Sequence, residues 1–278
     1  MILGIDLGGT QIRAGIVSGE VLKEVKSRPT PASGTKEEVL EAIAGLCDQF
    51  KSYPIEAIGI GVPSVVDVER GIVYSVTNIP SWNEVYLKDF LEERFKVPAF
   101  VNNDANCFAA GEKYFGKGKR AKSMAGVTLG TGLGTGLIFN NHLYEGKNCG
   151  AGELCNLSYL QHNYEYYCSG QFFKDEMKVS GKEMAKLASE GNREALDVFN
   201  QFGFHLGRFL QALMYAYDPE MIVLGGSVAS SFTYFRESMI QSLHEGFIFP
   251  KSLEGLRIER SELDNLAIYG AASLVLDK

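Results

Sequence analysis

The sequence predicts an α/β protein whose chain divides into two lobes, and three observations lead to that fold class. Short apolar runs typical of strands alternate with longer stretches of helical periodicity along the chain. A strand, a glycine-rich turn and a second strand follow one another in each half. The 278 residues are enough for one large domain or for two modest lobes.

The first half opens with an apolar run at residues 2–6, followed by two segments, 12–17 and 21–26, that alternate apolar and polar residues. We expect these three strands to form an antiparallel meander. Thr35 followed by Glu38 is a capping box, which predicts that a helix begins there. The expected strands are 2–6, 12–17, 21–26, 56–63 and 98–103, with a hairpin at 66–74, and the expected helices are 36–50 and 87–95.

The second half follows the same plan without repeating residues. Its expected strands are 124–130 and 135–140, with a strand and a glycine-rich turn at 221–227, and its expected helices are 105–115, 181–190, about 193–217 and 266–277. Residues 144–170, rich in tyrosine and cysteine, are expected to be irregular. No low-complexity linker separates the halves, so we expect the lobe boundary inside compact structure, near residues 105–120.

Composition excludes several classes of function. The net charge of −7, from 27 basic and 34 acidic residues, argues against general binding of nucleic acid. The apolar stretch at 267–276 is too short to cross a bilayer, so no membrane association is expected. No signal peptide is recognisable, and we expect a cytoplasmic protein whose five cysteines are reduced.

Three glycine-rich turns follow strands, at residues 6–10, 129–136 and 224–227. Glycine lets backbone N–H groups crowd around an anion, although plain hairpin turns would leave the same pattern. None matches a P-loop or a dinucleotide-binding turn. Two such turns from opposite lobes could instead clamp a triphosphate, with hydroxyl hydrogen bonds from Thr10 and Thr131. Asp6 would hold a hydrated Mg²⁺, or would simply close an Asx-turn.

Asp104 is placed where a predicted strand ends and a helix begins, in the sequence VNNDANCFAAGE. Ligands of open α/β sheets bind at such positions. The carboxylate could cap the helix, or it could accept a proton from a substrate hydroxyl.

Six segments in one order resemble the ROK family of repressors, open reading frames and sugar kinases. They are GIDLGGTQIRAGIV, GIGVPSVVD, NNDANCFAAGE, LGTGLGTGLIF, GAGE and VLGGS, and they extend over nearly the whole chain. The resemblance implies the actin-like ATPase (ribonuclease H-like) fold, with mixed sheets flanked by helices and a central cleft. The implied lobes are residues 1–105 plus about 266–278, and residues 106–265.

The resemblance also implies a glucokinase-like enzyme that uses ATP and Mg²⁺ to phosphorylate a hexose, glucose-like or an N-acetylhexosamine, at its 6-hydroxyl. Asp104 would be the general base. The implied sugar contacts are Ser64, Asn78, Asn103, Asp104, Glu153, Asn156 and Asp175. The implied nucleotide and metal contacts are Asp6, Gly8, Gly9, Thr10, Gly130, Thr131, Gly132, Gly225, Gly226 and Ser227. A homodimer is expected by analogy with the family.

The sequence departs from the family where most members bind a structural zinc. Asn156 occupies the expected histidine position, and Cys168 alone remains of the cysteine cluster, with Tyr166 and Phe173 at partner positions. No zinc site is therefore expected, and aromatic packing would replace the metal. Asp175 stands where the family has a sugar-binding glutamate.

Two other functions compete with the kinase. A sugar-responsive transcriptional regulator of the same family is disfavoured because the first strand begins at residue 2, which leaves no preceding DNA-binding segment in this sequence. A catalytically inactive sugar-binding protein is disfavoured by Asp104 and the three glycine turns. The identity of the sugar stays open.

Overall fold

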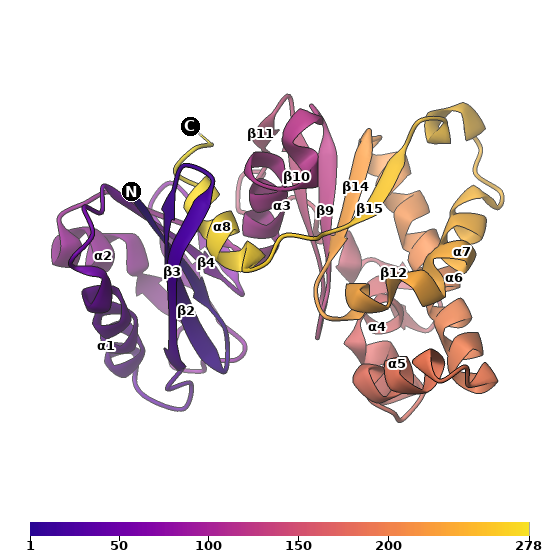
Figure 1. The fold of residues 1–278 in the computed structure, drawn as a ribbon, viewed down its shortest axis with the longest axis horizontal. Coiled ribbons are helices and arrows are strands. Elements are labelled where there is room, and N and C mark those ends of the chain that lie inside the picture. Colours follow the sequence, from indigo (N-terminus) through magenta and orange to yellow (C-terminus); the bar gives the residue numbers. More distant parts are fainter. Residues whose placement is uncertain (278) are drawn as a thin grey trace. The chain divides into compact units, whose positions relative to one another are not determined.

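The computed structural model describes residues 1–277, which form two compact units (Figure 1). Unit 1 comprises Met1–Arg120, Gly136–Ala151 and the chain from Glu262 onward. Unit 2 comprises Ala121–Thr135 and Gly152–Ser261. The expected boundary at residue 105 differs from this division, because α3 (Asp104–Tyr114) packs on α8 (Leu266–Ser273) in unit 1. Residues 136–151, expected in the second lobe, also belong to unit 1.

The sheet of unit 1 has the order β3-β2-β1-β4-β8. Its strands are β1 (Ile2–Leu7), β2 (Gln11–Ser18), β3 (Val21–Pro29), β4 (Ala57–Val62) and β8 (Ala99–Asn103). The first three form the predicted antiparallel meander, while β4 and β8 run parallel to β1. Because β1, β4 and β8 are parallel, their carboxyl ends share one edge of the sheet.

One face of this sheet is covered by α1 (Lys36–Cys47) and α2 (Leu87–Phe95), and the other by α8 (Figure 1). The predicted capping box of α1 is present: Thr35 Oγ1 accepts from the Glu38 N–H, and Glu38 accepts from the Thr35 N–H. Leu3, Ile5 and Leu7 point to the α1 side, where the main core lies. The strand alternation therefore leaves the even-numbered residues of β1 for the α8 side.

Glycines at that face let α8 approach the strands closely. Gly15, Gly4 and Gly59 lie side by side on three neighbouring strands. A Cβ on Gly4 would run into the backbone carbonyl of Ile268, and one on Gly59 into that of Ala271. The helix backbone thus rests on the sheet backbone, with no side chain between them.

A small antiparallel sheet, β5 (Val65–Asp67), β6 (Ile72–Tyr74) and β7 (Glu84–Tyr86), completes unit 1. It confirms the hairpin predicted around Gly71. Trp82, in the loop between β6 and β7, is fully buried in the core. Packing is therefore its role, as the composition of cores predicts.

The second sheet has the order β11-β10-β9-β14-β15, and the division between the units falls inside β10. Its strands are β9 (Met124–Leu129), β10 (Leu133–Phe139), β11 (His142–Leu143), β14 (Met221–Gly225) and β15 (Arg257–Arg260). In unit 2, β9, β14 and β15 are parallel. The carboxyl ends of β9 and β14, each followed by a glycine turn, therefore share an edge.

The helices of unit 2 are α4 (Tyr164–Cys168), α5 (Gly181–Ser189), α6 (Arg193–Tyr217) and α7 (Phe232–His244), and a two-stranded hairpin is formed by β12 (Ser158–Tyr159) and β13 (His162–Asn163). Helices α6 and α7 pack closely, since Cβ atoms on Gly203 and Gly207 would meet the backbone of α7. Across residues 1–277, no helix combines the length and the apolar character that a bilayer crossing requires.

We predict that Gly270→Ala destabilises the protein by about 1–3 kcal/mol, because the added methyl group would run into the backbone carbonyl of Cys107. Denaturant unfolding measures the change. Gly45→Ala is the matched helical control, since its Cβ would meet only the flexible guanidinium of Arg28. Equal stability of the two variants would contradict this account of the α3–α8 contact.

Candidate active site

In unit 1 the shared carboxyl edge gathers the residues expected to bind sugar and metal. In the register of β1, β4 and β8, Asp6 faces Gly61 and Val62 faces Asn103. The Asn103 amide Nδ2 donates to the Ser64 carbonyl oxygen at 3.2 Å. Chain segments far apart in sequence thus meet at one point.

The first glycine turn lies against another expected sugar contact. The Gly8 N–H donates to the Gln11 carbonyl at 2.9 Å, which closes a tight turn. A Cβ on Gly9 would lie 2.9 Å from the Cβ of Asn78. The structure therefore brings the turn at residues 8–10 beside Asn78, and only glycine permits this approach.

Asn103, and not Asp104, is the residue that caps α3. Its side-chain oxygen accepts from the N–H groups of Ala105 at 2.8 Å and Asn106 at 3.4 Å. Asp104 is the first helical residue and is exposed to solvent. Asp104 is therefore not the N-cap residue, although its Oδ1 also accepts from the Ala105 N–H at 2.9 Å. Its carboxylate lies in the first turn, where the helix dipole favours an anion.

The neighbouring Asn102 was missed in the sequence analysis, although it supports this corner. Its buried side-chain oxygen accepts from the Asn103 N–H at 2.8 Å, Asn106 Nδ2 at 3.0 Å and Cys149 Sγ at 3.2 Å. Its own amide donates to Glu145. Two asparagines at the end of a strand were the available signal, but sequence alone did not show which one is buried.

Asp6 and Asp104 both lie near the buried thiol of Cys107. Burial raises the pKa of Cys107 well above its usual value, and the carboxylates of Asp104 and Asp6 add to the effect. Burial also raises the pKa of Asp6, while the Arg13 guanidinium opposes that rise. Within residues 1–277 no hydrogen bond reaches the half-buried Asp6 carboxylate. Its oxygens are thus available to a cation, and carboxylate oxygen suits Mg²⁺.

In unit 2 the turn between β9 and β10 is held from outside by the segment around α4. The Gly170 N–H donates to the Gly130 carbonyl at 2.8 Å. Glu165 accepts from the Leu133 N–H at 3.1 Å with one oxygen and from Gln171 Nε2 at 3.2 Å with the other. Glu165 was not anticipated, since no short-range pattern connects it to the turn.

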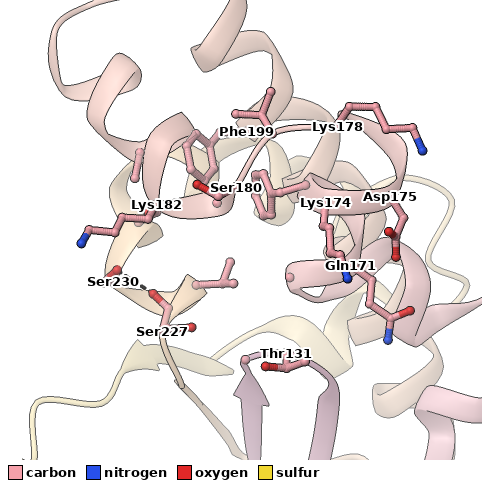
Figure 2. A pocket seen from close by; sticks show the side chains of 18 residues that line it. Thr131, Gln171, Lys174, Asp175, Lys178, Ser180, Lys182, Phe199, Ser227 and Ser230 are labelled. Carbon is pink, nitrogen blue, oxygen red and sulfur yellow. Dashed lines mark hydrogen bonds between the residues drawn. The ribbon is translucent and has the colours of Figure 1, made fainter.

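A pocket of about 870 Å³ opens over this turn (Figure 2). It brings together Gly130, Thr131 and Ser227, three of the residues expected to contact nucleotide. Its apolar lining includes Phe173, Val179, Ala185, Phe199 and Val228. Volume and composition are those of a small-molecule site. Gly132, Gly225 and Gly226 adjoin the lining residues in the chain without lining the pocket themselves.

The remaining expected sugar contacts lie in two places in unit 2. Glu153 begins a short 3₁₀ turn, and its carboxylate accepts from Asn156 Nδ2 at 2.8 Å, so these two residues meet. Asp175 instead lines the pocket with Thr131 and Ser227. Its expected contact with sugar stays a prediction.

Aromatic side chains occupy the region where the family's zinc would be expected. Tyr159 stacks on Tyr164 and its hydroxyl lies 3.1 Å from His205 Nδ1. Phe173 packs against Phe199 and Phe202. Among the described residues, no group of three or more histidine, cysteine or acidic side chains is arranged to hold a metal ion.

Mixed sheets flanked by helices, with glycine turns at the carboxyl ends of the strands, define this protein as one of the actin-like ATPase fold. The chain belongs to the ROK family, whose model matches residues 2–278.

The relatives of the chain include both enzymes and regulators. It is 30% identical to the glucokinase of Thermotoga maritima over 315 aligned residues, which cover 100% of this chain and 98% of the relative. It is 29% identical to the xylose repressor of Bacillus spizizenii, over 87% of this chain and 67% of the repressor. Among solved structures, a ROK family glucokinase from Streptomyces griseus in complex with glucose and AMPPNP matches with a TM-score of 0.83 and 28% identity, over 98% of both chains.

We predict that Glu165→Ala speeds amide hydrogen exchange at Leu133 about fivefold, because one hydrogen bond worth about 1 kcal/mol is lost. Glu165→Gln keeps an oxygen that accepts from the same N–H and should exchange nearly as slowly as the parent. Glu176→Ala, whose carboxylate pairs with the Tyr166 hydroxyl, is the control on the same segment. Unchanged exchange in Glu165→Ala would show that the turn does not depend on this contact.

Proposed function

We propose that the protein is an ATP-dependent sugar kinase that phosphorylates a hexose, glucose-like or an N-acetylhexosamine, at the 6-hydroxyl. The observation that carries the proposal is the placement of Asp104. Its exposed carboxylate stands in the first turn of α3, beyond the end of β8, next to a cap supplied by Asn103. A carboxylate there can orient a hydroxyl and take its proton as the phosphoryl group moves.

The acceptor side fits a sugar. Each sugar hydroxyl both donates and accepts hydrogen bonds, so paired amides and carboxylates suit it. Unit 1 supplies Ser64, Asn78 and Asn103 near Asp104, and unit 2 supplies the joined pair Glu153 and Asn156.

The donor side fits ATP. In the proposed complex the pocket of unit 2 takes the adenosine. The glycine turns would donate N–H groups at residues 9–10 and 131–132 to phosphate oxygens, because the N–H groups of Gly8 and Gly130 bond within their own turns. Asp6 would bind Mg²⁺ together with the nucleotide. The metal, when bound, neutralises charge developing on the transferred phosphoryl group.

We predict that Asp104→Asn lowers turnover at least ~10²-fold and leaves sugar affinity largely intact, because the amide keeps hydrogen-bonding capacity but cannot take a proton. A coupled ADP-release assay with separate calorimetric sugar titration measures both. Asp89→Asn is the matched control, since Asp89 is also in the first turn of a helix, α2, and is exposed. Comparable turnover by Asp104→Asn would refute its role as base.

The same assay across a panel of hexoses and N-acetylhexosamines identifies the acceptor. Analysis of the product by phosphorus–carbon coupling then tests transfer to the 6-hydroxyl. We expect a homodimer in the cytoplasm, on the resemblance alone, and light scattering tests the oligomeric state.

A regulator is the second candidate, because the similarity to a xylose repressor extends over 87% of this chain. A catalytically inactive sugar-binding protein is the third. Both would bind sugar without releasing ADP from ATP, so the assay above separates them from the kinase.

A further inference from the structure

The pocket of unit 2 is basic in an acidic protein. Three lysines, Lys174, Lys178 and Lys182, line it with a single carboxylate, Asp175. The whole chain carries a net charge of −7. In the part of the chain that the structure describes, none of these lysines forms an ion pair. A local excess of unpaired cations favours an anionic ligand.

Lys174 is distinguished from the other two by its backbone. It lies in a one-turn π-helix, Phe172–Glu176, in which the Met177 N–H donates to the Phe172 carbonyl at 3.1 Å. Such turns are rare in proteins, and those that do occur are frequently found at functional sites. The π-helix gives the segment a geometry that an ordinary α-helical turn would not have.

The segment that carries Lys174 is also fastened to the turn at residues 130–132. Gly170 donates to the Gly130 carbonyl, and a Cβ on Gly170 would lie 2.9 Å from that oxygen. Glu165 connects Gln171 to the Leu133 N–H on the far side of the turn. Lys174 is therefore held at a fixed place relative to N–H groups expected to bind phosphate.

Figure 2 shows how the three lysines differ in direction. The side chain of Lys174 runs into the pocket toward Gln171, above the turn with Thr131. The side chains of Lys178 and Lys182 extend away from the pocket at its rim. Only Lys174 thus points its ammonium group to where a ligand lying on the turn would place negative charge.

We propose that Lys174 binds the phosphate chain of the nucleotide donor and makes affinity depend on the number of its phosphates. The proposal rests on the kinase function proposed above. The apolar part of the pocket, with Phe199 and Val228, would take the base, and the ammonium group would pair with phosphate oxygens.

The test is calorimetric binding of adenosine, ADP and a non-hydrolysable ATP analogue to the full-length protein with Mg²⁺. Lys174→Met should lower the affinity for the ATP analogue roughly three- to tenfold and the affinity for ADP less. The affinity for adenosine should not change, because the ammonium group interacts only with phosphate charge. The loss should shrink at high salt. Lys174→Arg keeps the charge and should restore most of the affinity.

Lys186→Met is the control, because Lys186 is an exposed lysine of α5 that does not line the pocket, and it should bind all three ligands as the parent does. Lys178→Met and Lys182→Met, at the rim, should weaken the ATP analogue less than Lys174→Met does. Equal weakening of adenosine and the ATP analogue by Lys174→Met would overturn the assignment, since it would indicate a distorted pocket. The assignment would also be overturned if the parent bound the ATP analogue and Lys174→Met bound it with the same affinity. If the parent bound no nucleotide, the proposed function itself would fail, and the assignment with it.

Discussion

Close contact between backbones is the constraint on which unit 1 depends. Gly15, Gly4 and Gly59 remove side chains from the middle of one sheet face, so that α8 rests on the strands themselves. Gly270 on α8 and Gly111 on α3 then allow those helices to touch, with a Cβ on Gly111 placed 2.9 Å from the Gly270 Cα. Since α3 begins at Asp104, the same contacts that build the core also fix the direction of the proposed base.

In unit 2 the glycine turn at residues 130–132 is supported by hydrogen bonds from the segment around α4. Here Cys168 is buried among aromatic side chains, and the neighbouring Glu165, Gly170 and Gln171 reach the turn through hydrogen bonds. Stacked aromatic rings and the half-buried carboxylate of Glu165 together position the turn. Local order at the turn therefore depends on these direct contacts.

The sequence was most informative where local chemistry decides the structure. An apolar run and two alternating segments predicted the meander of β1 to β3, and the capping box predicted the start of α1. The sequence was least informative where contacts between distant parts of the chain determine the structure. Helix α7 has no side-chain cap, and β15 is a four-residue strand with charged residues, so neither shows a signal. Asn103, and not Asp104, is the N-cap residue of α3, and its N–H donates to the buried side chain of Asn102. A short motif does not show which of these residues is buried.

Charge explains why the proposed reaction needs two kinds of cation. Asp6 and Asp104 place two carboxylates at one edge of unit 1, near enough for both to raise the pKa of Cys107. A triphosphate approaching them would be repelled, unless a divalent ion bound to Asp6 reverses the local sign. The pocket of unit 2 includes the carboxylate of Asp175, which would also oppose a phosphate. In the proposed complex the ammonium group of Lys174 offsets that charge within the same pocket.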